Sequence, residues 1–399
     1  MLRCVVVVLA LLLSACASAP APPPGERPLV ILVSIDGFHP SYLDRSVTPV
    51  LSKLAAGGAS GAMRPSFPSK TFPNHYTLVT GLVPDRHGVV DNTMTDPEKP
   101  GVTFTQKNSL DGTWWDDATP LWVSAERAGL KTATLFWPGS EAEIRGARPS
   151  RYLAFDQSVT SSARADRLLA WIDEGRPAFA TLYFDEVDTA GHSLGPNAPA
   201  LNPTLARVDA AVGRLVDGLA ARGIATNIVI TADHGMAETS RERVIVLDDV
   251  VAMDAIKPTF GWGAYATLAP LPGREAEVAR ALAGPHANMT CWTKDRMPER
   301  FQYGKHARTP PWFCLPRTGW EIVPRARLAG LRPIGGNHGY DPADPSMLAV
   351  FIGAGPSFRS GARVPTFDNV DVYPLLMRLI GLPPERNDGD LIEVGPALR

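Results

Sequence analysis

Three aspartates and three histidines stand directly after short apolar runs or in glycine-rich segments, where side chains are free to do chemistry. The set is Asp36, Asp188, His192, Asp233, His234 and His338. Taken alone, Asp36 is explained as well by a turn or a helix cap as by a metal. Asp188 and His192 are four residues apart, so one helical turn places both on one face. Mixed carboxylate and imidazole ligation is typical of zinc, and two such ions would clamp both oxygens of a phosphoryl transfer.

A threonine near a predicted helix supplies a candidate nucleophile. Residues 68–76 read Pro-Ser-Lys-Thr-Phe-Pro-Asn-His-Tyr, and Pro73 suits the first position of a helix. Thr71 then lies just before the helix N-terminus, where backbone N–H groups favour an anion. A zinc ion can lower the pKa of a hydroxyl, although Thr71 could instead only cap the helix. Further along the chain, the Asn92 amide could donate to a nonbridging phosphate oxygen.

The apolar runs that precede these residues predict the sheet that positions them. Strand-like, β-branched runs occur at 28–35, 132–137, 178–184, 227–232 and 348–352. Helical periodicity lies between them at 121–128, 163–172, 205–221 and 370–380. This alternation predicts an α/β fold with a doubly wound, mostly parallel sheet and helices on both faces. In such sheets ligands bind beyond the carboxyl ends of the strands, where the aspartates and histidines stand.

The composition changes from about residue 257 to 333, where Pro, Gly, Trp and Arg dominate. This predicts a smaller inserted subdomain, either a cap or a β-rich unit near the site. The alternative is a loop-rich edge of the same domain. The catalytic domain as a whole is predicted to span 29–399.

Length and charge exclude some classes of protein. The chain has 399 residues, of which 45% are hydrophobic, with 39 basic and 41 acidic side chains. This is globular composition, and the chain is long enough to bury a large core. The balanced charge argues against a protein that binds long nucleic acid through its phosphates, whereas a small charged substrate is compatible. No pattern predicts an oligomeric state.

The first residues predict targeting rather than structure. Arg3 precedes an apolar run, and Leu-Ser-Ala-Cys at 13–16 resembles a bacterial lipobox. The resemblance implies that 1–15 is a signal peptide and that Cys16 is lipidated, with 16–28 as a tether. Ala17 after the cysteine favours the outer membrane, facing the periplasm. The alternative is an uncleaved membrane anchor, but about ten apolar residues fall short of the roughly 20 that span a bilayer.

Two cysteines remain in the mature chain. With Cys4 removed and Cys16 lipidated, Cys291 and Cys314 form an even pair in an oxidising compartment. We expect a disulfide between them, and two free buried thiols are the alternative.

The ordered motifs resemble the nucleotide pyrophosphatase/phosphodiesterase family of the alkaline phosphatase superfamily. They are Asp36, 70–75, 81–92, 188–192, 233–234 and 338–341, and the resemblance covers about 29–385. It implies an alkaline-phosphatase-like fold and two Zn²⁺ ions, one held by Asp36, Thr71, Asp233 and His234 and the other by Asp188, His192 and His338. It also implies that Thr71 forms a covalent phosphothreonine, while Asn92 and the backbone amide near Thr71 or Phe72 stabilise the transferring phosphoryl group.

The resemblance further implies a nucleotide substrate. In nucleotide-cleaving members two aromatic rings sandwich the base, and the matching residues are Phe72 and Tyr183, although Tyr183 could simply be a strand residue. Stacking of this kind does not select one base over another, because every base has a π-face. One departure is Glu186-Val187-Asp188, where the family often has proline at the middle position. The resemblance therefore predicts the neighbouring loop, and with it the substrate pocket, less closely than it predicts the metal ligand.

Other activities share parts of this pattern. A phospholipid or choline-ester phosphodiesterase, similar to a phospholipase C, and a phosphonate hydrolase of the same superfamily are the nearest alternatives. No extra basic clamp favours a phosphomonoesterase, and the sulfatase motif is absent. A non-catalytic binding lipoprotein would be expected to have a broken ligand set, whereas this set is complete.

Overall fold

The computed structural model describes residues 27–258 and 261–399. The predicted signal peptide, Cys16 and most of the tether lie outside the described residues. In the described part, one large sheet has the strand order β18-β2-β17-β8-β1-β7-β5-β6, with β19 beside β2. The bounds are β1 (Leu29–Ile35), β2 (Ala59–Arg64), β5 (Thr132–Leu135), β6 (Arg151–Leu153), β7 (Phe179–Phe184), β8 (Thr226–Thr231), β17 (Ala349–Ala354), β18 (Ala362–Arg363) and β19 (Phe367–Asp368).

The centre of the sheet is parallel and fully covered. All seven residues of β1 are buried, and β1 pairs in parallel with β7 on one side and β8 on the other. A strand that is covered on both faces needs a continuous apolar run, which is why the sequence predicted these strands well. β17 differs from the expectation because it pairs antiparallel to β8. The loop before β17 therefore meets the carboxyl ends of β1 and β8.

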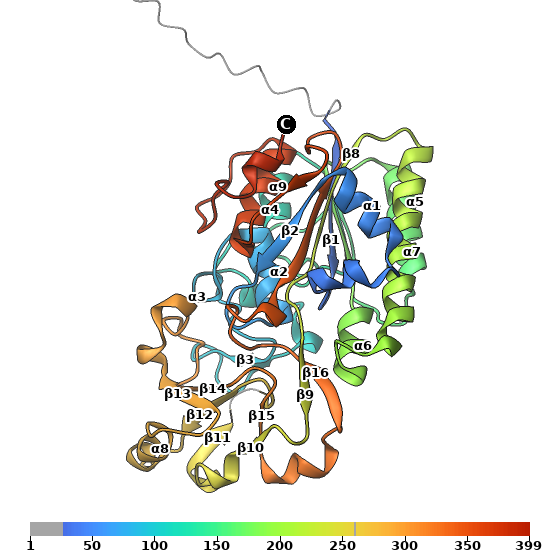
Figure 1. The fold of residues 1–399 in the computed structure, drawn as a ribbon. Coiled ribbons are helices and arrows are strands. Elements are labelled where there is room, and N and C mark those ends of the chain that lie inside the picture. The colour runs from blue at the N-terminus through green and yellow to red at the C-terminus, as the bar shows by residue number, and fades with distance from the viewer. Residues whose placement is uncertain (1–26, 259–260) are drawn as a thin grey trace, which may run out of the picture.

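Helices cover both faces of the sheet, as Figure 1 shows. One face carries α1 (Pro49–Gly57), α5 (Ser161–Glu174) and α7 (Asn202–Ala221). The other carries α2 (Thr71–Thr80), α4 (Leu121–Arg127) and α9 (Val372–Ile380). Helix α6 (Glu186–Leu194) follows β7 directly, and the short α3 (Pro84–His87) and the hairpin β3 (Met94–Thr95) and β4 (Thr103–Phe104) follow α2. No helix within the described ranges is both long and apolar enough to cross a membrane.

The changed composition around 257–333 corresponds to a second sheet. Its order is β11-β12-β14-β13, all antiparallel, with α8 (Glu275–Leu282) in the same segment. The strands are β11 (Ile256–Pro258), β12 (Ala266–Pro270), β13 (Met289–Thr293) and β14 (Trp312–Pro316). A separate apolar cluster underlies this sheet and includes Leu247 and Ile322, so the unit begins earlier than residue 257. We call the segment 244–323 the inserted subdomain.

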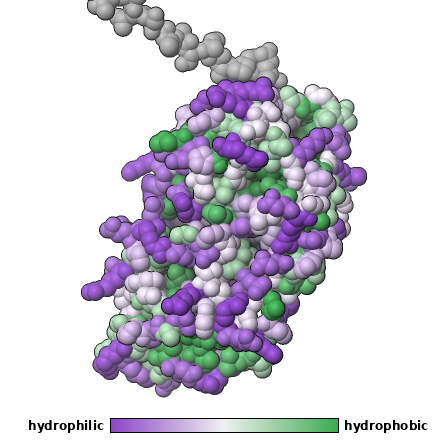
Figure 2. Space-filling view, viewed as in Figure 1, coloured by the Kyte–Doolittle hydropathy of each residue, from purple (hydrophilic) through white to green (hydrophobic). Residues whose placement is uncertain are grey.

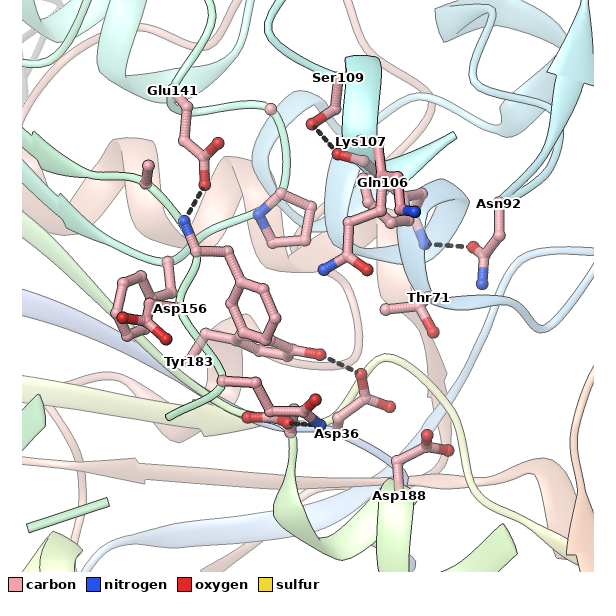
Figure 3. Close-up of a pocket in the computed structure, with 18 of the residues that line it drawn as sticks. Asp36, Thr71, Asn92, Gln106, Lys107, Ser109, Glu141, Asp156, Tyr183 and Asp188 are labelled. Atoms are coloured by element: carbon pink, nitrogen blue, oxygen red, sulfur yellow. Dashed lines mark hydrogen bonds between the residues drawn. The ribbon is translucent and has the colours of Figure 1, made fainter. Parts of the chain in front are cut away.

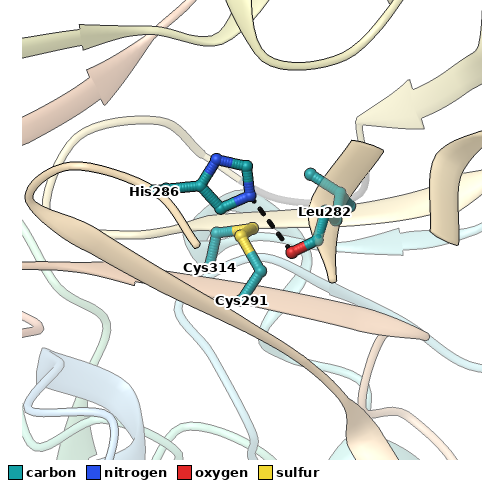
Figure 4. The surroundings of a disulfide bond; sticks show 4 residues. All are labelled: Leu282, His286, Cys291 and Cys314. Carbon is teal, nitrogen blue, oxygen red and sulfur yellow. Dashed lines mark hydrogen bonds between the residues drawn. A yellow bond between two sulfur atoms is a disulfide. The ribbon is translucent and has the colours of Figure 1, made fainter. Parts of the chain in front are cut away.

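Two strand pairs lie on either side of the boundary between the inserted subdomain and the main domain, the first inside the subdomain and the second just outside it. β10 (Val244–Val246) pairs with β15 (Glu321–Val323), and β9 (Ala237–Ser240) pairs with β16 (Ile334–Asn337). Within the subdomain Cys291 lies opposite Cys314 across β13 and β14, and the two form a disulfide (Figure 4). Figure 2 shows a mostly hydrophilic face, with apolar side chains gathered at the lower end over this subdomain. The insertion is thus a stapled unit beside the carboxyl edge of the main sheet.

Candidate metal centre and substrate pocket

Three adjacent strands deliver most of the predicted ligands to one edge of the sheet. Asp36 follows β1, Asp188 and His192 lie on α6 directly after β7, and Asp233 and His234 follow β8. Because β7, β1 and β8 are parallel neighbours, their carboxyl ends meet, and residues distant in sequence come together.

His338 arrives from the opposite direction. It follows β16 and precedes β17, the strand that runs antiparallel to β8. An antiparallel strand enters the sheet at the edge where the parallel strands end. The residue therefore joins the other ligands although it stands before its strand rather than after it.

The first ligand group surrounds the His234 imidazole. Its Nε2 lies 3.0 Å from Asp233 Oδ2, 3.6 Å from Asp36 Oδ1 and 3.5 Å from Thr71 Oγ1. Asp36, Asp233 and His234 are all at most 2% exposed. Four oxygen and nitrogen atoms thus converge on one small buried volume.

The second group surrounds Asp188. Its Oδ2 lies 3.4 Å from His192 Nε2, and its Oδ1 lies 3.5 Å from His338 Nε2. Asp188 also offers an oxygen within 4.8 Å of ligand atoms of Asp36 and His234. This carboxylate lies between the two groups, which are therefore direct neighbours.

The histidines are held with one nitrogen free. In each, Nδ1 is bonded to a backbone carbonyl: His234 to Gly235 at 2.9 Å, His338 to Ser69 at 2.9 Å and His192 to Gly336 at 2.7 Å. When Nδ1 carries the proton, Nε2 presents only a lone pair. Such second bonds are typical of histidines that ligate metals. Burial also lowers the pKa of His338 well below its ordinary value, which keeps that imidazole neutral.

Buried oxygens without partners complete the test for a metal. No hydrogen bond in the described part of the chain reaches Asp36 Oδ1, Asp188 Oδ1 or Asp233 Oδ2, although all three atoms are buried. Burial, followed by the nearby Asp233 and Asp188 carboxylates, raises the pKa of Asp36 well above its ordinary value. Lone pairs that face one another in a dry site are costly unless cations lie between them. The donor set therefore fits two divalent ions, and imidazole with carboxylate suits zinc.

His75 lies in this region but has both nitrogens occupied. Its Nδ1 donates to the Thr71 carbonyl at 2.8 Å, and its Nε2 lies 2.8 Å from the Ser34 hydroxyl. Nδ1 is also 3.5 Å from Asp233 Oδ2. We interpret His75 as a residue that holds the start of α2 against the sheet.

The predicted nucleophile lies at the first turn of α2. The helix begins at Thr71, two residues before the expected start at Pro73, and Lys70 takes the capping position. Phe72 N–H donates to Asn92 Oδ1 at 2.8 Å, so this backbone amide is already engaged. The side-chain amino group of Asn92 remains as a donor on the cavity wall, near Thr71 (Figure 3).

A cavity of about 630 Å³ opens beside Thr71 and Asp36. Figure 3 shows Asp36, Tyr183 and Asp188 at its floor. The Tyr183 side chain is 6% exposed, and its hydroxyl donates to Asp36 Oδ2 at 2.6 Å. The Phe155 ring, 5.9 Å from that of Tyr183, is more exposed and also lines the cavity. The sandwich of Phe72 and Tyr183 stays a prediction, and Phe155 is a second ring available to a base.

Sequence reasoning missed most of the polar wall of this cavity. The wall includes Gln106, Lys107, Glu141, Asp156 and Gln157. All five lie in short turns and connections without apolar periodicity or repeated motifs. Nothing in the sequence marks these positions apart from their place between predicted elements.

Comparison with known proteins agrees with this geometry. The family model described as type I phosphodiesterase / nucleotide pyrophosphatase matches residues 30–341. A Schizosaccharomyces pombe protein named as an uncharacterized pyrophosphatase/phosphodiesterase is 36% identical over 387 residues, covering 90% of this chain and 78% of the relative. Human ectonucleotide pyrophosphatase/phosphodiesterase family member 5 is 33% identical over 374 residues, covering 92% and 78%.

Solved structures give the same picture. The structure of human ectonucleotide pyrophosphatase/phosphodiesterase 5 superposes with a TM-score of 0.88 at 33% identity, covering 93% of this chain and 100% of the other. An inactive variant of the murine protein, in complex with AMP, superposes with a TM-score of 0.88 at 32% identity, covering 94% and 100%.

Proposed function

Because the chain belongs to the type I phosphodiesterase / nucleotide pyrophosphatase family, a family of hydrolases, we propose a specific reaction for it. The protein hydrolyses phosphodiester or pyrophosphate bonds of nucleotides and releases nucleoside monophosphates, using two zinc ions and a covalent phosphothreonine. The observation that carries this proposal is the convergence of seven ligand residues, Thr71 among them, into two neighbouring groups beside a cavity with aromatic walls.

The two ligand groups would each hold one zinc ion. Asp36, Thr71, Asp233 and His234 form one group, and Asp188, His192 and His338 form the other. When bound, the ions lower the pKa of a hydroxyl and neutralise the charge that develops on the phosphoryl group and its leaving oxygen. The buried, unpartnered carboxylate oxygens support this assignment.

Thr71 and Asn92 carry out the two displacement steps of the proposed reaction. Thr71 Oγ1 loses its proton and attacks phosphorus, the bond to the leaving oxygen of the alcohol or phosphate breaks, and that oxygen departs with the electron pair and takes up a proton. Water then attacks the resulting phosphothreonine, which frees the monophosphate and returns the hydroxyl to Thr71. Asn92 donates its amino group to a nonbridging oxygen in both steps. The hydrogen bond from Phe72 N–H fixes the orientation of that amide.

The cavity supports a nucleotide as the substrate. AMP occupies the murine relative in its solved complex, and the cavity here has room and rings for a base. Stacking between Phe72 and either Phe155 or Tyr183 would hold the base. The comparisons give no support to a phospholipid or choline-ester diesterase, or to a phosphonate hydrolase.

We also propose a place in the cell. The lipobox-like segment at 13–16 supports lipidation of Cys16 and an outer-membrane anchor that faces the periplasm. The disulfide between Cys291 and Cys314 is compatible with that setting, because disulfides persist in oxidising compartments.

Initial rates on three nitrophenyl esters test the proposal. The zinc-loaded protein is assayed with the esters of thymidine monophosphate, phosphorylcholine and plain phosphate. We expect the thymidine ester to react at least about tenfold faster, because base stacking contributes roughly 1–3 kcal/mol. Fastest turnover of phosphorylcholine would assign the enzyme to lipid-type diesters, and fastest turnover of plain phosphate would contradict a diester site.

Two threonine variants of the same helix control this experiment. Thr71→Ala removes the nucleophile and is expected to lower kcat by about a thousandfold or more. Thr80→Ala is the matched control, because its hydroxyl donates to the Tyr76 carbonyl and accepts the Leu82 N–H at the far end of α2. Undiminished hydrolysis by Thr71→Ala would overturn the mechanism.

A further inference from the structure

A cluster of aromatic rings joins the inserted subdomain to the loop before the nucleophile. Phe67 stacks on Phe301 at 4.2 Å and packs against Phe313 at 5.1 Å between ring centroids. Tyr265 stacks on Phe313 at 4.8 Å, and Tyr303 packs edge-on to the same ring at 5.7 Å. Phe67 belongs to the main domain and the other four rings to the subdomain. The contact is a packed core and not a loose interface.

Two hydroxyl groups of this cluster reach the segment that carries Asn92. Tyr303 donates to the Val90 carbonyl at 3.2 Å, and Tyr265 donates to Asp91 Oδ2. Both tyrosines are at most 5% exposed. Two consecutive residues before Asn92 are therefore bonded to the inserted subdomain.

Asp91 passes this restraint on to Asn92. Its other oxygen, Oδ1, accepts the backbone N–H of Asn92 at 2.6 Å. The Asn92 side chain in turn accepts from Phe72 N–H at 2.8 Å, next to Thr71. A continuous chain of hydrogen bonds thus leads from Tyr265 to the first turn of α2.

The ring of Tyr265 also lies against two other segments of the site. Lys70 Nζ stands 5.5 Å from the ring centroid, and Lys70 precedes Thr71. Gly339 follows His338 and lies so close that an added Cβ would meet Tyr265 Cε1 at 2.8 Å. One residue of the subdomain therefore touches the neighbours of Thr71, Asn92 and His338.

We propose that Tyr265 and Tyr303 are positioning residues, and that the inserted subdomain serves as a clamp that fixes Asn92 for catalysis. Preorganised donors are effective because they need no rearrangement during the reaction. The tyrosines act through Val90 and Asp91 and do not reach the cavity themselves. This inference rests on the proposed function, since it assigns Asn92 a role in phosphoryl transfer.

A double-mutant cycle separates positioning from mere packing. Tyr265→Phe removes one hydroxyl and keeps the ring, and Asn92→Ala removes the donor through which Tyr265 acts. We expect Tyr265→Phe to lower kcat on the thymidine ester about tenfold with little change in KM. In the Asn92→Ala background the same change is expected to have an effect of less than about twofold. Tyr303→Phe should behave in the same way.

Tyr373→Phe is the matched control. Tyr373 is buried on α9, and its hydroxyl accepts the Glu385 N–H far from the cavity. Tyr373→Phe also removes one hydrogen-bonded hydroxyl from a buried ring, so it controls for the loss of a buried hydroxyl, and kcat should stay at the wild-type value. An equal loss of kcat from Tyr265→Phe in both backgrounds, or no loss in either, would overturn the clamp.

Amide hydrogen exchange provides a readout that does not depend on activity. Residues 88–95 should exchange faster in Tyr265→Phe than in the wild type, and Tyr373→Phe should leave them unchanged. If the wild type hydrolysed none of the three esters, the proposed function would fail, and this exchange would still decide whether the clamp exists. Unchanged exchange at 88–95 would refute it.

Discussion

The ligand cluster and the cavity wall beside it are built in opposite ways. Asp36, Asp233 and His234 are almost fully buried and follow the ends of central strands, and Nδ1 of His234 is pinned to a carbonyl. The wall that would meet the base comes from exposed connections such as 106–110 and 154–157. The contrast teaches that the sheet fixes the chemistry, while loops that tolerate change set the choice of substrate.

Of the changes that probe these two regions, removal of the metal from the ligand cluster should lower the rate of hydrolysis the most. Chelation is expected to lower hydrolysis by at least about a hundredfold, because three buried carboxylates then face one another uncompensated. Zinc at a hundredfold excess over its Kd should restore activity and stabilise the fold by about 3 kcal/mol. Assays of rate and Tm before and after dialysis measure both. A cavity-wall variant such as Leu110→Ala serves as the control, and its activity should depend on zinc as that of the wild type does. Full activity without metal would contradict the assignment of the cluster as a metal site.

Variants of the two rings beside Asp36 should have an intermediate effect. Phe155→Ala is expected to raise KM for the thymidine ester about tenfold with a smaller change in kcat, because it removes a stacking surface. Tyr183→Phe keeps its ring and loses the hydrogen bond to Asp36, so it should lower kcat instead. Steady-state kinetics distinguish the two. An unchanged KM in Phe155→Ala would favour Tyr183 as the ring that meets the base.

A third group of acids, of which only Asp371 is buried, should show the smallest effect. Asp371 lies near Asp390 and Glu393 without any histidine, and burial followed by its acidic neighbours raises its pKa to about 7. The folded protein then holds a proton that the unfolded chain, with a pKa near 3.8, releases. Its stabilising contribution is fully present below pH 3.8 and is lost as the pH rises through about 7.

Asp371→Asn mimics the protonated state and should therefore stabilise the protein at pH 8 by about 1 kcal/mol or less, with no gain at pH 4. Thermal unfolding at both pH values, with the exposed Asp217→Asn as control, measures the difference. A gain of equal size at pH 4 would mean that Asp371 does not titrate in this range. Such a result would weaken the contrast between the carboxylates of the ligand cluster, which would bind a metal, and Asp371, which would bind a proton.

Much of the sheet could be predicted from the sequence because its central strands are buried on both faces. Runs such as 28–35 and 178–184 are continuous and apolar, and the structure has β1 and β7 there. The polar residues directly after them then mark the carboxyl edge. His338 was recognisable as a candidate ligand in a glycine-rich segment, but its grouping with Asp188 and His192 came only from family resemblance, since it precedes its strand and the direction of β17 cannot be deduced from its composition.

The rest depends on contacts that leave no local pattern. β2 (59–64) has a mixed sequence and is recognisable as a strand only through its pairing with β17. The polar cavity wall and the bond from Tyr265 to Asp91 join residues that lie in separate parts of the chain, without periodicity. The start of α2 at Thr71 shows the same limit on a smaller scale, because Pro73 signals a helix but not its first residue.

The direction of β1 also separates the anchor from the cavity. The strand starts at Leu29, two residues after Arg27, and ends at Ile35, just before Asp36, so its seven residues place this ligand about 23 Å from the point where the chain enters the fold. With a lipid on Cys16, as we propose, the tether would enter the fold at the end of β1 opposite to the ligands. Attachment at that end would leave the ligand edge of the sheet free of the tether, so the anchor would not have to pass the mouth of the cavity.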